Sequence, residues 1–448
     1  MVGTRPLFIK GGRIVDPSQG LDLVGDLLLQ EGRVAYVGAP LDTAPDAEVL
    51  DASGLIVSPG FIDLHCHLRE PGFEHKETIA TGTLAAARGG FTTVCCMPNT
   101  EPAIDSAVVV DFIQRKAAAE GVVRVLVIGA VTRGRLGKEL ADLGELADAG
   151  VIAVSDDGSP VANAALMKSA LLYMKPYGLP VIDHCEDPVL SRGGVMNEGA
   201  VSSRLGLRGV PAAAEENMVA RNIQLAELTG GWVHLAHLST AGSVAMVRAA
   251  KERGLPITAE VMPHHLTLTD AWALGRQGEG DVNDPLTATA YDTTTKVNPP
   301  LRSSTDIDAL VEGLRDGVID IVATDHAPHA AVDKEVTYDE AAFGISNIET
   351  ALGSLLSLVH AGRIDLQTLV QRMTAAPATL LGRAGQGLGS LKTGSVGDVV
   401  IFNAEAPWEV DPAAFVSRGK NSPLRGVTLK GRVFATVFNG SVAYQEGA

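Results

Sequence analysis

The chain has 448 residues, of which 46% are hydrophobic and 20% are charged, so it can bury a large core and form two or three domains. Its formal net charge of −17 argues against nucleic acid or an anionic membrane surface as the main partner, because both require clustered Lys and Arg. The sequence shows neither a signal-peptide pattern nor an apolar stretch of about 18 residues, and we expect a cytoplasmic protein. The four cysteines lack disulfide or zinc-knuckle spacing and are expected to be reduced.

Both ends of the chain carry short apolar or alternating runs broken by glycine, which predict β-strands rather than helices. Near the N-terminus these runs are 7–10, 12–15, 26–29, 33–37 and 55–57, and near the C-terminus they are 398–402, 426–429 and 432–437. We therefore expect the two ends to build one small β-sandwich domain from residues 1–57 and 386–448.

Between the two ends, strand-like runs alternate with Ala- and Leu-rich stretches of helical period, such as 78–88, 215–229 and 242–253. Eight such runs are present: 61–65, 92–97, 123–128, 151–155, 180–184, 232–237, 257–262 and 319–324. Eight strands close a barrel, and an open doubly wound sheet would rarely give eight strands with polar residues at the same end. This pattern predicts an α/β fold, a (β/α)8 TIM-type barrel over residues 58–385.

Polar residues follow nearly every one of these strands, at the edge where such barrels place their chemistry. His65 and His67 are two apart on a strand, so both imidazoles project to one face. The other candidates at strand ends are Asp156, Asp157, Asp183, His184, His237, Asp325, His326 and His329. His234 is three residues before His237 and is expected on the opposite face. Each residue alone would be an ordinary core histidine or helix cap, but together they indicate a metal centre with the nitrogen and oxygen ligands that Zn(II) prefers.

The segment Pro59–Gly72, which contains His65-Cys-His-Leu-Arg69, resembles class I dihydroorotases of the amidohydrolase superfamily. The resemblance spans essentially the whole chain. It continues through Lys76-Glu-Thr, Arg88–Thr93, Met97-Pro-Asn-Thr100, Asp156-Asp-Gly, His184-Cys-Glu-Asp187, Ala259-Glu260, Pro263-His-His-Leu266, Asn298-Pro-Pro-Leu-Arg302, Ala323–His329 and Phe343-Gly344. Many hydrolases share the two histidines, whereas Arg69, Met97-Pro-Asn-Thr100 and Asn298–Arg302 together are specific.

This resemblance implies the reversible cyclisation of N-carbamoyl-L-aspartate to L-dihydroorotate and water, a step of de novo pyrimidine (UMP) biosynthesis. It also implies one or two zinc ions per subunit, with two favoured. In this family the first zinc is bound by His65, His67 and Asp325, and the second by His184 and His237. An aspartate at strand four, matched by Asp157 rather than Asp156, replaces the carboxylated lysine that bridges the metals in many relatives. A metal-bound hydroxide is the expected nucleophile, and Asp325 is the expected general acid and base.

The same resemblance assigns the substrate contacts. Arg69 suits a bidentate grip on the α-carboxylate that substrate and product share, although an arginine at this place could also form an ordinary surface ion pair. The other residues matched to substrate contacts are His67, Asn99, Asn298, His329, Phe343 and Gly344.

Two connections are singled out by their composition and length. Residues 330–342 are rich in charge and predict a surface loop over the pocket, which is either a lid or a variable connection. Residues 269–295 look longer than the equivalent connection of the family and are expected near the active-site mouth or at a subunit contact.

The sequence leaves two competing interpretations. Dihydropyrimidinases, hydantoinases and allantoinases share the barrel and metals, but their substrates have less use for Arg69 with Asn99, and a bridging lysine would be expected at strand four; Lys168 and Lys175 lie beyond that strand. A non-catalytic relative that scaffolds aspartate transcarbamoylase would be expected to lose ligands, and none is lost here. We expect a small-molecule substrate and a homo-oligomer, and an active complex with aspartate transcarbamoylase stays open.

Overall fold

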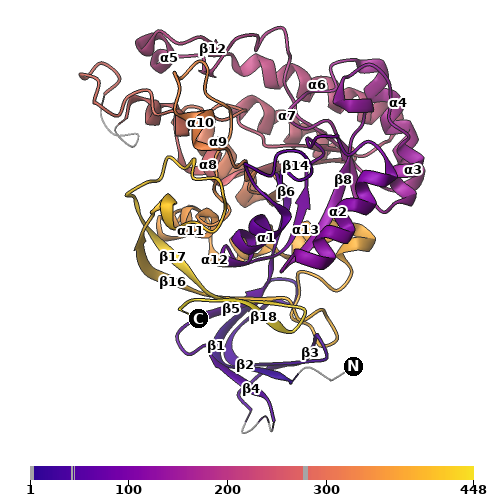
Figure 1. Ribbon diagram of the computed structural model, residues 1–448, viewed down its shortest axis with the longest axis vertical. Helices are drawn as coiled ribbons and strands as arrows, with labels where there is room; N and C mark the ends of the chain where they lie inside the picture. The colour runs from indigo at the N-terminus through magenta and orange to yellow at the C-terminus, as the bar shows by residue number, and fades with distance from the viewer. Residues whose placement is uncertain (1–4, 42–43, 45, 276–280, 448) are drawn as a thin grey trace.

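The computed structural model describes residues 5–41, 44, 46–275 and 281–447. It has two parts, a barrel and a smaller β domain that contains both the first and the last strand of the chain, β1 (Leu7–Asp16) and β18 (Ser441–Gln445) (Figure 1). The predicted barrel and the β domain built from both ends are therefore confirmed as the fold class. We propose that the boundaries between the two domains lie at residues 57/58 and 385/386.

One eight-stranded sheet forms the β domain, in the order β18-β17-β16-β5-β1-β2-β3, with β4 paired to β1. Its strands are β1 (Leu7–Asp16), β2 (Leu21–Gln30), β3 (Arg33–Gly38), β4 (Glu48–Asp51), β5 (Ile56–Pro59), β16 (Val399–Glu409), β17 (Thr428–Phe438) and β18 (Ser441–Gln445). β1 is one strand where the sequence predicts two, because a register shift between Ile9 and Gly12 lets the strand pass through the glycine pair without ending. β17 is likewise one strand, although the sequence predicts two runs there, 426–429 and 432–437.

The eight predicted barrel strands are all present, in the order β6 to β10 and β13 to β15 around the barrel. They are β6 (Phe61–Cys66), β7 (Phe91–Cys96), β8 (Arg124–Gly129), β9 (Ala153–Ser155), β10 (Val181–Asp183), β13 (Val233–Leu235), β14 (Ile257–Val261) and β15 (Ile321–Val322). The last strand meets the first through two backbone hydrogen bonds, from Asp325 N to His65 O (2.9 Å) and from His67 N to His326 O (2.9 Å). This closure brings the residues after β15 beside those at the end of β6.

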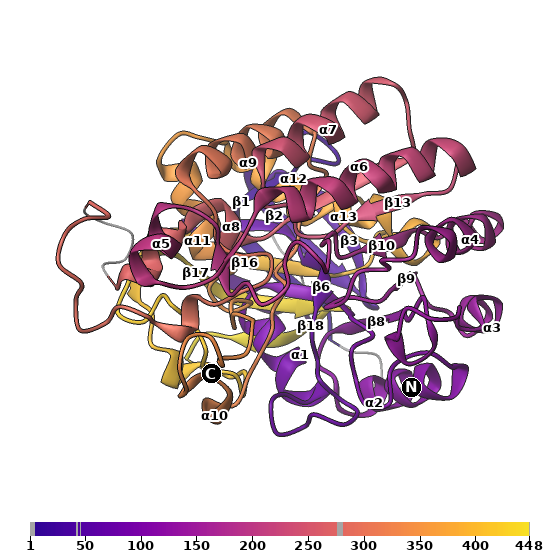
Figure 2. The ribbon, with the colours of Figure 1, turned by 90° about the horizontal axis from the view of Figure 1, so that it is seen from above.

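Helices surround the barrel, as the view from above shows (Figure 2). They are α1 (Ile79–Arg88), α2 (Ala107–Glu120), α3 (Leu143–Asp148), α4 (Ala164–Met174), α5 (Ala200–Leu205), α6 (Ala212–Thr229), α7 (Ala241–Glu252), α8 (Pro263–Thr267), α9 (Ser304–Asp316), α10 (Ala331–Lys334), α11 (Ala351–His360), α12 (Leu366–Met373) and α13 (Ala375–Leu380). A short two-stranded sheet, β11 (Met196–Asn197) with β12 (Gly209–Val210), lies between α4 and α6 in the chain. Local sequence explains α1: the Thr78 side chain accepts from Thr81 N, and Ile79, Gly82, Thr83 and Ala86 recur at helical spacing and bury one face.

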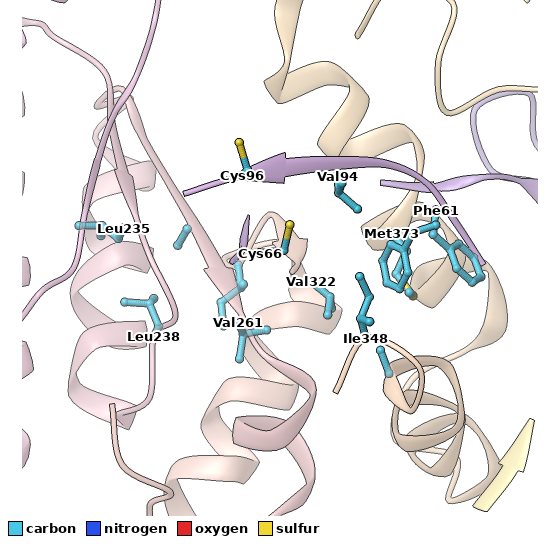
Figure 3. Packing of buried hydrophobic residues seen from close by; sticks show 14 of the residues in the cluster. Phe61, Cys66, Val94, Cys96, Leu235, Leu238, Val261, Val322, Ile348 and Met373 are labelled. Carbon is cyan, nitrogen blue, oxygen red and sulfur yellow. The ribbon is translucent and has the colours of Figure 1, made fainter. Parts of the chain in front are cut away.

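Two apolar layers hold the barrel together. The outer layer packs strand residues such as Val94 and Val261 against the surrounding helices, with Phe61 beside Met373 of α12 (Figure 3). The inner layer fills the lumen with residues such as Ile62 and Ile182. Because the strands are buried on both faces, their sequences read as nearly continuous apolar runs, which is why they could be recognised without a structure.

The two long connections are only partly surface loops. Residues 330–342 include the short helix α10, and its last residue, Lys334, is buried. Of the predicted 269–295 excursion, residues 276–280 lie outside the described residues, whereas Ala273 and Leu274 pack against Val195 and Met196. Among the residues described, no helix is both long enough and apolar enough to cross a membrane.

Candidate metal centre and active site

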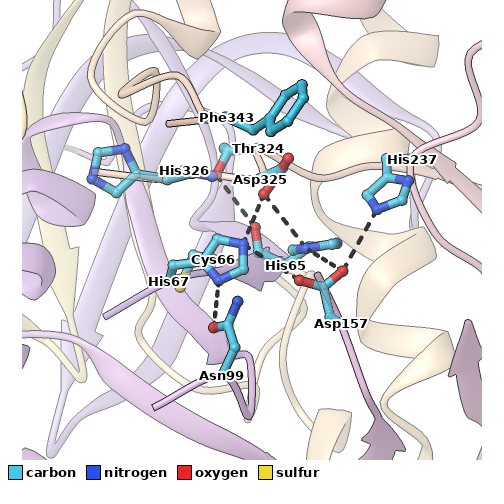
Figure 4. Close-up of polar contacts among 12 residues, drawn as sticks. His65, Cys66, His67, Asn99, Asp157, His237, Thr324, Asp325, His326 and Phe343 are labelled. Carbon is cyan, nitrogen blue, oxygen red and sulfur yellow. Dashed lines mark hydrogen bonds and ion pairs between the residues drawn. The ribbon is translucent and has the colours of Figure 1, made fainter. Parts of the chain in front are cut away.

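The two histidines of the first barrel strand point into one cluster with two aspartates (Figure 4). His65 Nε2 lies 3.5 Å from Asp157 Oδ1 and 3.6 Å from Asp325 Oδ1. His67 Nε2 lies 2.9 Å from Asp325 Oδ1 and 3.6 Å from Asp157 Oδ2. His65 lies on β6 and His67 follows its last residue, Cys66; both Nε2 atoms face the same two aspartates, as the spacing of two predicts.

Of the two aspartates after β9, only Asp157 faces this cluster. Its Oδ1 lies 3.5 Å from His237 Nε2 and 3.8 Å from His184 Nδ1, so its carboxylate stands between the first and second pair of histidines. Asp156 turns away and accepts hydrogen bonds from the backbone N–H groups of Val131 and Thr132. The geometry therefore places Asp157, and not its neighbour Asp156, in the cluster.

His184 and His237 form the other side of the cluster, with His184 Nδ1 and His237 Nε2 only 2.8 Å apart. The second nitrogen of His184, Nε2, lies 3.0 Å from Glu186 Oε2. A histidine whose far nitrogen is held by a carboxylate has a fixed ring orientation and a more basic near nitrogen, which is the usual arrangement of a metal-binding histidine.

Three residues of this site have a left-handed backbone: Arg69 (φ 62°), His237 (φ 32°) and Asp325 (φ 48°). Non-glycine residues rarely adopt this conformation, and each such residue costs about 1–3 kcal/mol. Each one follows the end of its strand, where the positive φ redirects the side chain toward the cavity. Strain of this kind concentrates at functional sites, and here it occurs at three residues that follow three different barrel strands.

The cluster fits a metal ion. Two triads, His65–Asp157–His237 and His65–His67–Asp325, each hold three ligand atoms within 4.8 Å of one another. His65 Nε2 and Asp157 Oδ1 are buried without a hydrogen-bond partner, which is costly unless a cation satisfies them. Although burial opposes it, the charges of Asp157 and Glu260 raise the pKa of His65, so the local potential favours positive charge.

The opposite wall of the cavity is cationic. Arg69 Nε donates to Pro328 O (3.2 Å), and its Nη2 lies 3.4 Å from His329 Nε2. Burial lowers the pKa of the Arg69 guanidinium to about 10, while Asp325 and Asp157 oppose the shift, so Arg69 is charged at neutral pH. Burial and then the charge of Arg69 lower the pKa of His329 to about 3, so His329 is neutral. Asn99 lies nearby, with its Oδ1 2.8 Å from His67 Nδ1.

The remaining predicted contacts form a third wall. Asn298 Nδ2 donates to Glu186 Oε2 (2.5 Å) and lies 3.3 Å from His184 Nε2. Phe343 O lies 2.8 Å from His329 Nε2, and Gly344 N donates to Lys296 O (2.9 Å). Phe343 is partly exposed and its ring lies above the cluster in Figure 4.

These walls enclose a cavity of about 230 Å³. It is lined by His67, Arg69, Asn99, Asp157, Gly158, His184, His237, Val297, Asn298, Asp325, Ala327, His329, Phe343 and Gly344. The structure thus brings together every predicted site residue; His65 lies just behind the surface, fully buried. A ligand in this cavity would have a guanidinium at one end and the histidine–aspartate cluster at the other.

Sequence reasoning missed the carboxylates that hold the histidines. Glu260, on β14, places Oε1 2.6 Å from His65 Nδ1 and Oε2 3.3 Å from His234 Nε2. Of the two histidines near the end of β13, which ends at Leu235, only His237 lines the cavity, whereas His234 lies against Glu260. Glu260 belongs to the Ala259-Glu260 motif, but its role depends on the contact with His65, which is 195 positions away in the chain.

Comparison with known proteins agrees with this site. The Dihydro-orotase-like family model matches residues 54–243. Dihydroorotase from Pelotomaculum thermopropionicum is 52% identical over 441 residues, covering 98% of this chain and 99% of the relative. Dihydroorotase from Anaeromyxobacter dehalogenans strain 2CP-C is 49% identical, covering 98% of each chain. The chain belongs to the dihydroorotase family.

Several solved structures named as hydantoinases or dihydropyrimidinases have the same fold. L-hydantoinase (dihydropyrimidinase) from Arthrobacter aurescens superposes with a TM-score of 0.86 at 23% identity, covering 99% of this chain and 97% of that one. D-hydantoinase (dihydropyrimidinase) from Thermus sp. gives a TM-score of 0.80 at 25% identity, covering 99% and 96%. Family membership and fold together make the chain a cyclic amidohydrolase with a (β/α)8 barrel.

Proposed function

We propose that this protein interconverts N-carbamoyl-L-aspartate and L-dihydroorotate, with water released on ring closure and consumed on ring opening. The observation that carries the proposal is the pairing of Arg69 with the histidine–aspartate cluster across one cavity. Both substrate and product have an α-carboxylate beside the reacting amide, and this cavity offers a charged guanidinium at one end. Membership of the dihydroorotase family supports the same reaction.

We propose zinc as the metal and two ions as the complement of the site. His65, His67 and Asp325 would hold one ion, His184 and His237 the other, and Asp157 would contact both, because it lies between the two groups. Imidazole nitrogen and carboxylate oxygen are the donors expected for Zn(II). Zinc bound here would lower the pKa of a water molecule and polarise the reacting carbonyl.

Asp325 is the proposed general base and acid. Burial raises the pKa of its carboxyl group, but the hydrogen bond with His67 and the charge of His65 outweigh burial and hold the pKa below its usual value. Asp325 is therefore ionised and can accept a proton as water attacks the ring amide. It then returns that proton to the ring nitrogen as the C–N bond breaks. In the reverse direction Asp325 takes the proton from the ureido nitrogen as the C–N bond forms, and returns it to the departing oxygen as the C–O bond breaks and water leaves.

The other walls orient the substrate. Arg69, Asn99 and His329 would bind the α-carboxylate, and Asn298 with the Phe343–Gly344 backbone would bind the ring or ureido amides. His67 contacts both Asn99 and Asp325, so it links the carboxylate end to the reacting end. No side-chain nucleophile is required.

Hydantoinase or dihydropyrimidinase activity is the second candidate, on the evidence of fold. A bridging lysine would be expected after the fourth barrel strand, β9, and the structure does not favour one. Lys168 is exposed on α4 and Lys175 donates to Thr229 O, so neither lysine reaches the cluster. A homo-oligomer, a cytoplasmic location and a complex with aspartate transcarbamoylase remain proposals that size measurement, fractionation and co-purification would test.

The decisive experiment is an assay of the purified protein, with its zinc content measured, on L-dihydroorotate, dihydrouracil and hydantoin. We expect turnover of L-dihydroorotate and formation of the same compound from N-carbamoyl-L-aspartate. Preferred turnover of dihydrouracil or hydantoin would overturn the proposal and favour the second candidate. Absence of turnover from a protein with full zinc would favour a scaffold role.

A further inference from the structure

Two buried lysines lie behind the wall formed by Asn298, Phe343 and Gly344. Lys334 ends α10 and is 6% exposed, and Lys296 precedes Asn298 by two residues and is 2% exposed. Neither lines the cavity, and neither has a role in the proposed reaction. Burying an ammonium group costs several kcal/mol unless its hydrogen bonds are replaced, so two such lysines beside a binding site need a physical explanation.

Lys334 joins two separate stretches of backbone through three carbonyl groups. Its Nζ donates to Thr293 O (3.1 Å), Lys296 O (3.1 Å) and Ala342 O (2.6 Å). An ammonium group has three N–H donors, so these three carbonyl groups satisfy it completely. In the other direction, Thr293 Oγ1 donates to Lys334 O (2.6 Å). Residue 334 is therefore fixed to the 293–296 segment through both its side chain and its backbone.

Lys296 makes the reciprocal connection. Its Nζ donates to Asp339 O (3.0 Å) and lies 4.5 Å from the centre of the Phe343 ring. Its carbonyl group accepts from Gly344 N (2.9 Å) as well as from Lys334. We call Lys296 and Lys334 the lysine clamp, since each lysine extends from its own segment to bind the backbone of the other.

The clamp holds the two segments that carry the proposed amide contacts. Asn298 follows Lys296 on one segment, and Phe343 with Gly344 follows Ala342 on the other. Without the Nζ of Lys334, the carbonyl groups of Thr293 and Ala342 would lose this donor, Lys296 O would keep only Gly344 N, and the link through Nζ between Ala342 and Lys296 would be lost. The two segments would then be joined by weaker means: the bond from Gly344 N to Lys296 O, the Lys296 side chain, the bond from Thr293 Oγ1 to Lys334 O, and the contact between Thr295 Oγ1 and Tyr338 Oη (3.1 Å).

We propose that Lys334 is a positioning residue that sets the affinity of the site for its ring and ureide ligands, by holding the Phe343–Gly344 backbone and Asn298 at a fixed separation. This inference rests on the proposed function only in taking those three residues as substrate contacts. It predicts an effect on binding rather than on the chemical step, because the clamp does not touch Asp325 or the histidines.

The test compares Lys334→Met, which keeps length and apolar volume but removes the donors, with Lys168→Met on the exposed face of α4 as the matched control. Loss of buried hydrogen bonds should raise KM for L-dihydroorotate and N-carbamoyl-L-aspartate by about tenfold, with kcat within about threefold and zinc content unchanged. Lys168→Met should match the unmodified protein. An unchanged KM, or a loss confined to kcat, would overturn the inference.

A milder variant covers the case in which Lys334→Met fails to fold. Thr293→Val removes only the hydrogen bond to Lys334 O and should raise KM about two- to threefold, in keeping with one net hydrogen bond. If Thr293→Val and the unmodified protein have equal KM, the clamp does not set affinity. If the unmodified protein opens dihydrouracil or hydantoin instead of L-dihydroorotate, the proposed function fails. The KM values of the variants and the unmodified protein, measured on the ring that is opened, then still decide the role of Lys334.

Discussion

Arg69→Ala tests the proposal that this arginine binds the carboxylate of the substrate and so distinguishes a carboxylated ring from an uncharged one. The Arg69 guanidinium has two contacts within the protein, with Pro328 O and His329 Nε2, which leave most of its N–H groups free to meet a ligand. Since its pKa is lowered only to about 10, it carries a full positive charge at neutral pH. The variant would remove the only arginine that lines the described cavity.

The expected loss follows from the number and kind of hydrogen bonds. A hydrogen bond to a charged group contributes about 1.5–3 kcal/mol, so a bidentate grip on a carboxylate amounts to about 3–6 kcal/mol. At 1.36 kcal/mol for each factor of ten, kcat/KM should fall by about 10²- to 10⁴-fold. Arg69 is separate from the histidine–aspartate cluster, so we expect zinc content to stay the same.

Steady-state kinetics in both directions, with metal analysis of each preparation, provide the assay. An enzyme cannot change the equilibrium between its substrates, so kcat/KM must fall by the same factor for ring opening and ring closure. Arg115→Ala, on the exposed surface of α2, is the matched control and should lose nothing. A fall of less than about threefold, or loss of zinc from Arg69→Ala, would refute the assignment of Arg69 to the carboxylate.

Three further predictions concern the metal centre and the acid stability of the fold. Glu260→Gln removes the carboxylate held by His65 Nδ1 and should weaken zinc binding by about 10- to 100-fold in a chelator competition, whereas Glu252→Gln on the exposed end of α7 should not. Removing zinc with a chelator should lower the Tm, because metal that binds only the native state stabilises it by about 4 kcal/mol at a thousand times its Kd; an unchanged Tm would argue against a metal in this cluster. Glu77 has a lowered pKa, because contacts with His326 and Ser417 outweigh its burial, so it adds stability above its unfolded pKa of 4.5 and loses it as the pH falls. In urea unfolding, Glu77→Gln should therefore be less stable at pH 7, with a difference that shrinks below pH 4.5; a difference independent of pH would contradict this.

Much of the fold and site could be predicted from sequence because the signals are local. A strand buried on both faces gives an apolar run, and eight such runs with polar residues after them indicate a barrel and its catalytic edge. His65 and His67 are two positions apart, so strand geometry alone places them on one face. Arg69 follows them closely, and the local motif therefore contains both the proposed metal ligands and the arginine that we propose binds the carboxylate.

Only the tertiary structure could decide the contacts between residues distant in the chain. Asp156 and Asp157 are equivalent by composition and position, and the difference arises because Asp156 meets the backbone of Thr132 while Asp157 faces His65 and His237. Glu260 and Lys334 look like ordinary charged residues in sequence, one in a strand and the other in a loop. Barrel closure and the packing of two separate connections bury both, and a buried charge must find partners wherever the fold places them. The sequence alone therefore determined which groups are available for chemistry, and the fold determined which groups hold them in place.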